Sequence, residues 1–281
     1  MFAVTGASGQ LGRLVLDTLL EAIDARQIVA LVRDPAKMAD YASRGVVVRR
    51  FDYGDPASLS PALDGVDRLL LISGNELGQR VAQHRAVIEA AKAAGIGFLA
   101  YTSILHADTS PIGLAGEHRE TEALLAASVL SHALLRNGWY NENYTAGAVP
   151  AVEHGAVLGS SGTGRISAAA RADYAAAAAN VLIEGTAGIF ELAGDDAFTL
   201  ADFAGFLADV SGRAVAYLDM PEADYRAALE QVGLPAPLAA MLADSSAQAS
   251  TDALFDDGGA LGRLIGRPTV PMRVSVAAAL G

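Results

Sequence analysis

The 281-residue chain carries a formal net charge of −12, contains no cysteine, and has 52% hydrophobic and 19% charged residues. The negative charge disfavours direct binding to nucleic acid or to an anionic membrane surface, and the lack of cysteine excludes disulfides, thiolate catalysis and Cys-ligated metals. No window approaches about 18 uninterrupted apolar residues, and the N-terminus enters the first predicted strand at once. We therefore expect a soluble, cytoplasmic protein with no membrane span and no signal peptide.

The first 137 residues alternate strand and helix patterns, which predicts a Rossmann-like α/β fold with a doubly wound parallel sheet. Asp34-Pro35 and Asp55-Pro56 each combine an N-cap residue with a proline at the first helical position. A long helix is expected over residues 76–94 and should end at Gly95. The predicted strands cover residues 2–5, 28–32, 46–51, 68–73, 97–102 and 131–136.

After Arg136 the pattern becomes irregular and indicates a small, mostly helical C-terminal substrate lobe. An aromatic loop is expected over residues 138–144, a helix near Pro150, and an alanine-rich helix over residues 171–183. Residues 165–170 look extended, and residues 189–192 and 214–218 are strand candidates. The expected nucleotide-binding domain is residues 1–137 plus about 165–195, and the expected substrate lobe is about 138–164 and 196–281.

A glycine-rich turn lies between the first predicted strand and an amphipathic helix that repeats Leu11, Val15, Leu16, Leu19 and Leu20 on one face. Gly6 permits a tight turn with positive φ, Gly9 lets the backbone approach a phosphate, and Gly12 lets the helix pack closely on the strand. A G-x-x-G-x-x-G spacing alone also suits a plain turn. Its place between a strand and a helix predicts a pyrophosphate site at the helix N-terminus. The residues assigned to this site are Gly6, Ala7, Ser8, Gly9, Gln10, Leu11 and Gly12.

Arg33 directly follows the second predicted strand, where an acid would take a ribose 2′-hydroxyl in an NAD-binding fold. An arginine instead matches a 2′-phosphate, so the cofactor expected is NADPH; the alternative is an exposed surface arginine. Asp52, at the end of the third strand, is a candidate to contact adenine, with a turn-forming aspartate as the alternative. Ser73, Gly74 and Asn75 end the fourth strand and are expected to line the ribose side of the cofactor, unless they form a plain turn.

Several segments together carry a resemblance that covers about two-thirds of the chain. They are VTGASGQLG, ALVRDPAK, DYGD, LLLISG, QHRAVIEAAKAAG, AYTSILHADTSPIGLAGEH, LLRNGWYNENY, RADYAAAAA and ELAGD. In this order they resemble the atypical short-chain dehydrogenases of the NmrA-like type, within them the bacterial flavin-independent NAD(P)H:quinone oxidoreductases. The first segment is generic to the superfamily, whereas NGWYNENY and TSILHADTSP are much more specific.

The chain departs from the Tyr-x-x-x-Lys pair that short-chain dehydrogenases commonly use as acid and pKa-lowering partner. Aligning Glu122 and Leu125 with the extended motif puts Leu114 at the tyrosine position and His118 at the lysine position. This disfavours reduction of ordinary ketones, whose nascent alkoxide needs an acid, but suits a quinone, which yields a stabilised phenolate. His118 is a candidate to orient the nicotinamide ribose or to donate a proton; the alternative is a locally hydrogen-bonded histidine on the helix surface.

The resemblance implies that the segment after the sixth strand contacts the cofactor: Asn137, Gly138, Trp139, Tyr140, Asn141 and Glu142. Trp139, Tyr140 and Tyr144 offer flat faces for an aromatic substrate, with packing of the lobe as the alternative, and Tyr140 is also a candidate catalytic residue. His106 is a further candidate for the substrate pocket. His84, His132 and His154 show no metal-ligand spacing with acids, so no metal is expected.

These observations predict a reductase that transfers hydride from NADPH directly to a small quinone held over the nicotinamide. One alternative is reduction of other electron-poor aromatics, such as triarylmethane dyes. Another is a non-catalytic sensor that binds NADP(H) and reports its redox state to a partner. The sequence does not indicate which quinone is used, nor the oligomeric state.

Overall fold

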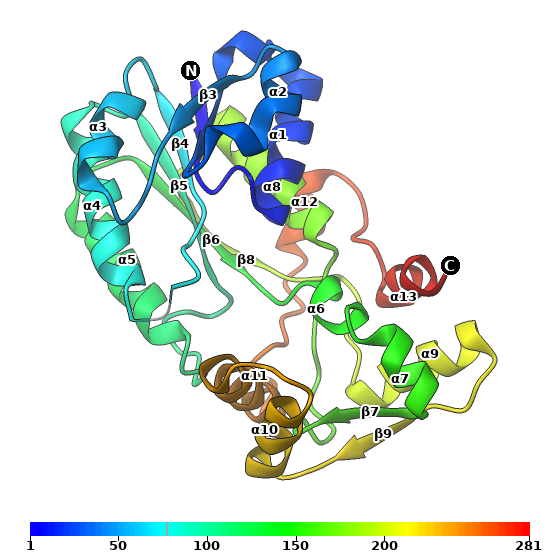
Figure 1. Ribbon diagram of the computed structural model, residues 1–281. Helices are drawn as coiled ribbons and strands as arrows, with labels where there is room; N and C mark the ends of the chain where they lie inside the picture. Colours follow the sequence, from blue (N-terminus) through cyan, green and yellow to red (C-terminus); the bar gives the residue numbers. More distant parts are fainter. Residues whose placement is uncertain (77) are drawn as a thin grey trace. The chain divides into compact units, whose positions relative to one another are not determined.

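Seven strands form one sheet in the order β3-β2-β1-β4-β5-β6-β8 in the computed structural model, which describes residues 1–76 and 78–281 (Figure 1). The pairs from β3 through to β6 are all parallel. This order confirms the doubly wound, Rossmann-like sheet, with its topological switch point between β1 and β4. The strands are β1 (Phe2–Val4), β2 (Ile28–Val32), β3 (Val47–Arg50), β4 (Arg68–Leu71), β5 (Phe98–Ile104), β6 (His132–Asn137) and β8 (Gly188–Leu192).

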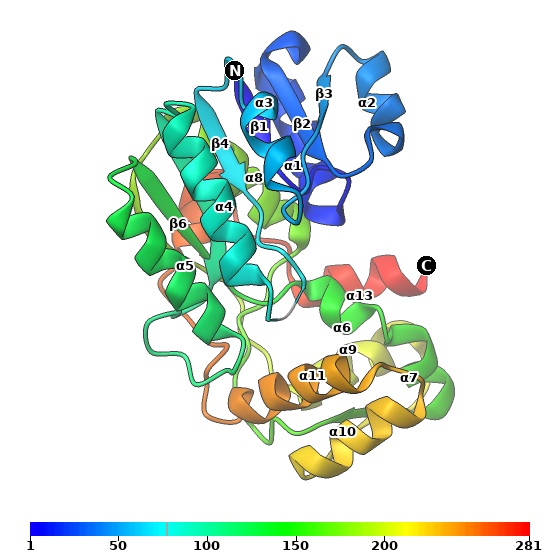
Figure 2. The ribbon, with the colours of Figure 1, turned by 60° about the vertical axis from the view of Figure 1, so that its left-hand side comes forward.

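Helices cover both faces of this sheet (Figures 1 and 2). One face carries α1 (Gln10–Ala22), α2 (Ala39–Ser43) and α8 (Arg171–Glu184), and the other carries α3 (Leu59–Ala62), α4 (Arg80–Ala93) and α5 (Ala115–Ala127). Side chains alternate between the two faces along each strand. Leu69, Leu71 and Leu99 therefore pack in one buried cluster with Val87 and Ile88 of α4. Burial on both faces explains why these strands are almost uniformly apolar.

The chain divides into two compact units. Unit 1 comprises Met1–Ala107, Glu117–Asn137 and Ala172–Phe190, and unit 2 comprises Asp108–Gly116, Gly138–Arg171 and Glu191–Gly281. Both the sequence and the structure divide the chain after Asn137. The segment that returns to unit 1 is shorter than the expected 165–195, and residues 108–116 belong to unit 2, an assignment that the sequence did not indicate.

Unit 2 contains a two-stranded parallel sheet of β7 (Ala156–Gly159) and β9 (Ala216–Asp219). The helices described in unit 2 are α6 (Asn141–Thr145), α7 (Ala148–His154), α9 (Leu200–Ser211), α10 (Glu222–Gln231), α11 (Ala236–Ala249), α12 (Ala260–Ile265) and α13 (Met272–Leu280). Helix α9 begins with a capping box, in which Thr199 and Asp202 each accept a hydrogen bond from the other's backbone N–H. Within the described residues, none of the helices is long and apolar enough to cross a membrane.

Two local expectations were wrong, and one strand was not predicted. Helix α4 begins at Arg80 rather than Glu76, because Gly78 adopts a left-handed φ of 79° that interrupts a helix. Residues 141–144, expected in a loop, belong to α6. Residues 165–170, which were expected to be extended, form isolated bridges at Ile166 and Ala169. Strand β7 was not predicted, because a four-residue stretch of alanine, valine, leucine and glycine has no clear period.

Candidate functional site

The glycine turn between β1 and α1 has the geometry that a phosphate site requires. Gly6 has a φ of 57°, which favours glycine, and its carbonyl accepts a hydrogen bond from the Gly9 N–H at 2.9 Å. A Cβ on Gly12 would lie 2.5 Å from the Gly6 oxygen, so only glycine allows this close approach of α1 to β1. The first N–H groups of α1 have no partner within the helix and can bind an anion. The turn therefore fits the pyrophosphate of a dinucleotide.

The other residues of the turn divide by burial. Ala7 and Leu11 are buried, so only their backbone can face a ligand, and the Ala7 N–H donates to the Leu31 carbonyl at 3.3 Å. Ser8 is half-buried and Gln10 is exposed. Their contacts with a cofactor remain predictions.

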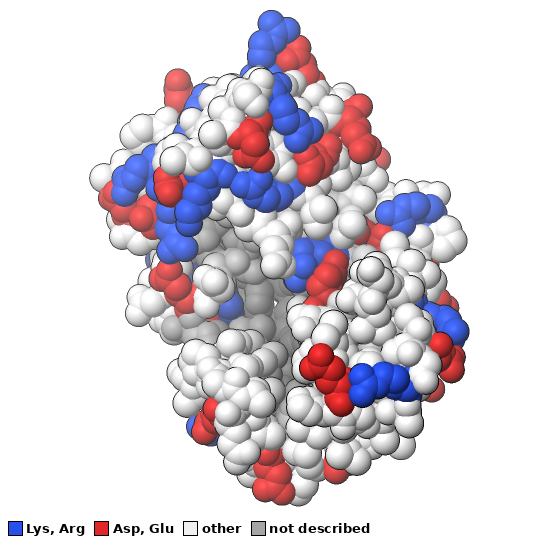
Figure 3. Space-filling model, turned by 45° about the vertical axis from the view of Figure 1, so that its right-hand side comes forward, with Lys and Arg blue, Asp and Glu red and all other residues white. Residues whose placement is uncertain are grey.

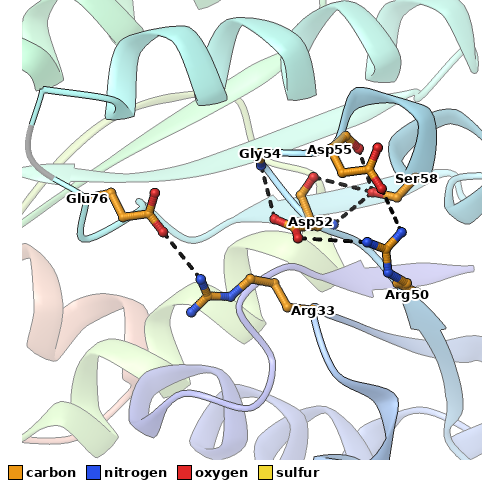
Figure 4. Close-up of polar contacts among 7 residues, drawn as sticks. All are labelled: Arg33, Arg50, Asp52, Gly54, Asp55, Ser58 and Glu76. Atoms are coloured by element: carbon orange, nitrogen blue, oxygen red, sulfur yellow. Dashed lines mark hydrogen bonds and ion pairs between the residues drawn. The ribbon is translucent and has the colours of Figure 1, made fainter.

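Arg33 lies just beyond the end of β2, with 69% of its side chain exposed (Figure 4). Its guanidinium contacts one carboxylate oxygen of Glu76 at 3.3 Å, and the other oxygen accepts from the Gln83 amide at 2.8 Å. Because β1 lies between β2 and β4 in the sheet, this ion pair joins segments on opposite sides of the carboxyl end of β1. An exposed pair of this kind is weak, so Arg33 can exchange Glu76 for a phosphate.

Asp52 follows β3 and forms a turn, the alternative that the sequence left open. Its carboxylate accepts from the Gly54 N–H at 3.0 Å and lies 3.9 Å from the Arg50 guanidinium (Figure 4). Arg50 donates to Asp55 at 2.7 Å, so Asp55 pairs with an arginine instead of capping the short 3-10 helix that follows it. These contacts explain Asp52 without a ligand, and its contact with adenine remains a prediction.

His118 lies inside unit 1 and not on its surface, so the alternative of a surface histidine is wrong. It is 4% exposed, and its Nδ1 lies 2.8 Å from the Tyr101 hydroxyl of β5. Burial, and then the nearby charge of Arg80, lower the pKa of His118 to about 3. The imidazole is therefore neutral at ordinary pH and is not a strong acid. Burial likewise raises the pKa of Tyr101, so this pair does not replace the Tyr and Lys of other short-chain dehydrogenases.

Asn137, the last residue of β6, presents a buried amide oxygen. The residue is 6% exposed, and its Oδ1 has no hydrogen-bond partner within the described chain. An unpaired buried acceptor is costly and favours a ligand with a hydrogen-bond donor at this carboxyl end of the sheet. This supports the prediction that Asn137 contacts the cofactor.

The segment after Asn137 is fixed within unit 2. Gly138 N–H donates to the Leu192 carbonyl at 2.8 Å, and Trp139 and Asn141 both form backbone hydrogen bonds with Ala169. The Arg171 guanidinium carbon lies 4.7 Å from the centre of the Tyr140 ring. These contacts define the backbone direction at Trp139 and Tyr140, whose roles at a substrate remain predictions.

Asn141 and Glu142 make contacts that hold unit 2 together. The buried Asn141 amide donates to the Val270 carbonyl at 3.1 Å and to the Ser275 hydroxyl at 2.9 Å. Both Glu142 oxygens accept from the Arg171 N–H at the start of α8. These observed contacts are structural, and cofactor binding by either side chain remains a prediction.

Unit 2 contains a cavity of about 580 Å³ with largely apolar walls. Tyr144 packs edge-on against Phe198, with ring centres 5.5 Å apart, and burial raises the pKa of its phenol. The cavity is large enough for a bicyclic aromatic ligand, and its aromatic and aliphatic lining suits one. Residues that line it include Trp139, Tyr144, Leu200, Phe203, Tyr225 and Leu242.

His106 is half-buried in unit 1 and has a left-handed φ of 51°, an uncommon conformation for a residue other than glycine. Leu114 is half-buried in unit 2 and immediately precedes α5. A leucine has no proton to give, so the position of the usual tyrosine carries no acid. A role for His106 in substrate binding stays a prediction.

Sequence reasoning missed two buried residues of α4 that contact the loop after β4. Arg80 Nε donates to the Gly74 carbonyl at 2.7 Å, and His84 Nε2 accepts from the Gly74 N–H at 3.0 Å. Their i, i+4 spacing on one helix was a usable signal, because it places both side chains on one face. What they face depends on tertiary contacts that no local pattern records.

Comparison with known proteins agrees with this geometry. The model of the NAD(P)H-binding family matches residues 6–183. Quinone oxidoreductase 2 of Escherichia coli (strain K12) is 56% identical over 278 residues, which cover 98% of this chain and 97% of that protein. The crystal structure of the NADPH-dependent quinone oxidoreductase QOR2 from Escherichia coli, complexed with NADPH, has a TM-score of 0.98 and 55% identity, with full coverage of both chains.

A second solved structure is that of the Citrobacter sp. triphenylmethane reductase complexed with NADP(H). It has a TM-score of 0.96 and 34% identity, and the match covers 99% of this chain and 100% of that one. The family match over more than half of the chain and the nearly full-length identity confirm the NmrA-like resemblance. The chain belongs to the family of NAD(P)H-binding proteins.

Proposed function

We propose that the protein is an NADPH-dependent quinone oxidoreductase that passes hydride directly to a small quinone. Its nearly full-length similarity to quinone oxidoreductase 2 supports the activity. The observation in the structure that carries the choice of acceptor is the burial of His118, which lowers its pKa, together with Leu114 at the position of the usual acid. A site of this kind suits an acceptor that needs no protonation during hydride transfer.

The residues of the chain bind and orient the cofactor and the acceptor and keep water away from the acceptor. The turn from Gly6 to Gly12 binds the pyrophosphate through backbone N–H groups, and Arg33 binds the 2′-phosphate. NADPH supplies the hydride. Trp139 and Tyr144 hold the acceptor ring, and the apolar walls of the cavity exclude water from it. Addition of the hydride would convert the quinone to a quinol monoanion, whose phenolate oxygen would take up one proton from water once the product leaves the cavity.

Turnover should follow the electrophilicity of the acceptor. We expect steady NADPH oxidation with benzoquinones and naphthoquinones, and no turnover with simple aliphatic ketones of similar size. The measurement is the loss of NADPH absorbance across a panel of quinones, ketones and cationic dyes. Ketone reduction at rates comparable to those of quinones would contradict an acid-independent mechanism. Binding of NADP(H) with negligible turnover across the whole panel would favour the sensor.

Reduction of triarylmethane dyes is the second candidate. The observation that favours it is the match to the triphenylmethane reductase over nearly the whole chain. A larger kcat/KM for cationic dyes than for any quinone in the same panel would select it.

His118→Ala should lower kcat only modestly, by about tenfold or less, below the ~10²–10⁴ typical of losing a general acid. The neutral imidazole has no acidic proton to contribute, and its loss removes only the partner of Tyr101. Stopped-flow measurement of the hydride-transfer rate checks this prediction. Thermal unfolding is recorded as well, because the variant leaves the buried Tyr101 hydroxyl without its contact to His118 and can lower Tm. A hydride-transfer step slowed a thousandfold in a folded variant would show that His118 acts as a general acid.

A further inference from the structure

Side chains bind five backbone groups of Ile72, Ser73 and Gly74, the first residues of the loop that follows β4. The Ile72 N–H donates to the Thr5 hydroxyl at 2.9 Å, and the Ile72 carbonyl accepts from the Tyr53 hydroxyl at 2.7 Å. The Ser73 N–H donates to the Thr102 hydroxyl at 2.8 Å. A loop held in this way has a single backbone path without belonging to a strand or a helix.

Both polar groups of Gly74 are bound by α4. Its N–H donates to His84 Nε2 at 3.0 Å, and its carbonyl accepts from Arg80 Nε at 2.7 Å. His84 is fully buried and Arg80 is 5% exposed, so solvent does not compete for either contact. The two bonds therefore set the orientation of the loop at Gly74.

A second layer of contacts orients these two side chains from α5. Arg80 donates to Glu117 at 2.9 Å, and Glu117 also accepts from the Gly78 N–H at 2.9 Å. His84 Nδ1 lies 3.0 Å from the Thr121 hydroxyl, which donates to the Glu117 carbonyl. Two chains of contacts therefore lead from Gly74 to α5, one through Arg80 to Glu117 and one through His84 to Thr121. Helices α4 and α5 lie side by side in Figure 2.

The hydrogen bonds define the tautomer of His84. Because Nε2 accepts from Gly74, the ring proton is on Nδ1 and is donated to Thr121. Burial, and then the charge of Arg80, lower the pKa of His84 to about 3. His84 therefore remains an acceptor for Gly74 across the ordinary pH range.

The strand order places this loop beside the cofactor. Ligands of doubly wound sheets bind at the carboxyl ends of strands next to the switch point, here β1 and β4. The glycine turn after β1 and Arg33 after β2 take the pyrophosphate and the adenosine end. Strand β4 lies on the opposite side of β1 from β2. The loop after β4 is therefore expected to contact the nicotinamide half of the cofactor.

We propose that His84 and Arg80 are positioning residues that fix the Gly74 peptide, so that the loop after β4 is preorganised for the nicotinamide half of NADPH. The proposal rests on the proposed function in one respect only, namely that NADPH is the cofactor. Neither side chain touches the cofactor in this arrangement; both act through the loop.

The test compares two ligands in variants of His84. NADPH contacts both halves of the site, whereas 2′,5′-ADP reaches only the glycine turn and Arg33. His84→Leu should raise the Kd of NADPH about tenfold, the scale of one hydrogen bond, and leave the Kd of 2′,5′-ADP unchanged. His84→Gln should recover most of the NADPH affinity, because its amide oxygen can accept from Gly74. His132→Leu, at the opposite end of the sheet, is the matched control and should change neither Kd.

Two variants of Thr121 provide a second test, which remains valid even if His84→Leu does not fold. Thr121→Val removes the acceptor for His84 Nδ1 and should weaken NADPH severalfold, while Thr121→Ser keeps the hydroxyl and should not. Calorimetry measures both ligands. Equal weakening of NADPH binding and 2′,5′-ADP binding in His84→Leu would indicate general destabilisation and overturn the proposal. An unchanged NADPH affinity in both His84→Leu and Thr121→Val would also overturn it. Failure of the unmodified protein to bind 2′,5′-ADP would instead count against the cofactor site itself.

Discussion

Replacing Arg33 by alanine is expected to weaken NADPH binding by about 1.5–3 kcal/mol, roughly 10- to 150-fold, and NADH binding very little. The guanidinium lies beyond the end of β2, where it can bind a 2′-phosphate by charge-assisted hydrogen bonds. Its present partner, Glu76, is held by an exposed pair at 3.3 Å that a doubly charged phosphate can replace. Titration of each cofactor into the unmodified protein and the variant measures the effect.

Arg50→Ala is the matched control for this prediction. Arg50 lies at the end of the neighbouring strand β3 and is similarly exposed, but its guanidinium is bound by Asp55 at 2.7 Å (Figure 4). We expect the NADPH affinity of this variant to change less than threefold. Equal loss in both variants would indicate a general electrostatic effect, and equal affinity of the unmodified protein for NADPH and NADH would sink the assignment of Arg33.

Charge on the surface supports a specific role for Arg33. Figure 3 shows basic side chains close to acidic ones over much of the face drawn. Many arginines of the described chain form ion pairs, among them Arg13–Asp40 and Arg44–Asp17. A protein with a net charge of −12 does not attract an anionic cofactor by its overall field. The affinity for NADPH must come from local donors, which makes Arg33 and the glycine turn decisive.

Much of the sheet could be predicted because its strands are buried on both faces. Ile28–Val32 is fully buried and apolar, and its predicted bounds match the structure. The glycine turn could also be predicted from the sequence, because the local backbone geometry requires glycine at positions 6 and 12. These features depend on residues close together in the chain, so the sequence pattern records them directly.

The contacts that could not be predicted join segments far apart in the sequence. The burial of His118 depends on Tyr101 of β5, and α5 carries many charged residues that suggest an exposed helix. The contacts of Gly74 with Arg80 and His84 depend on how a loop meets the next helix. Strand β7 is defined by pairing with β9, about 60 residues later. Local propensity contains none of this information.

The glycine turn gives the second large effect. Gly9→Val should weaken NADPH binding by roughly 100-fold, near the upper end of what overpacking a tight contact costs, while the protein stays folded. Gly9 is exposed and has φ −76° and ψ 170°, an extended conformation that valine readily adopts. Its Cβ would lie 3.2 Å from the Gly6 oxygen, which needs only a small adjustment, but the two methyl groups would occupy the approach of the pyrophosphate.

Two further glycine variants separate binding from folding in this prediction. Gly12→Ala should prevent folding or lower Tm sharply, because its Cβ would meet the Gly6 oxygen at 2.5 Å and the Ala7 Cα at 2.7 Å. Gly116→Ala, in α5 with no neighbour within 4 Å, should leave both Tm and NADPH affinity intact. Calorimetry with NADPH and thermal unfolding distinguish the three variants. Normal NADPH affinity in a folded Gly9→Val protein would mean that the pyrophosphate binds away from the turn, since the two methyl groups would stand in its approach to the N-terminus of α1.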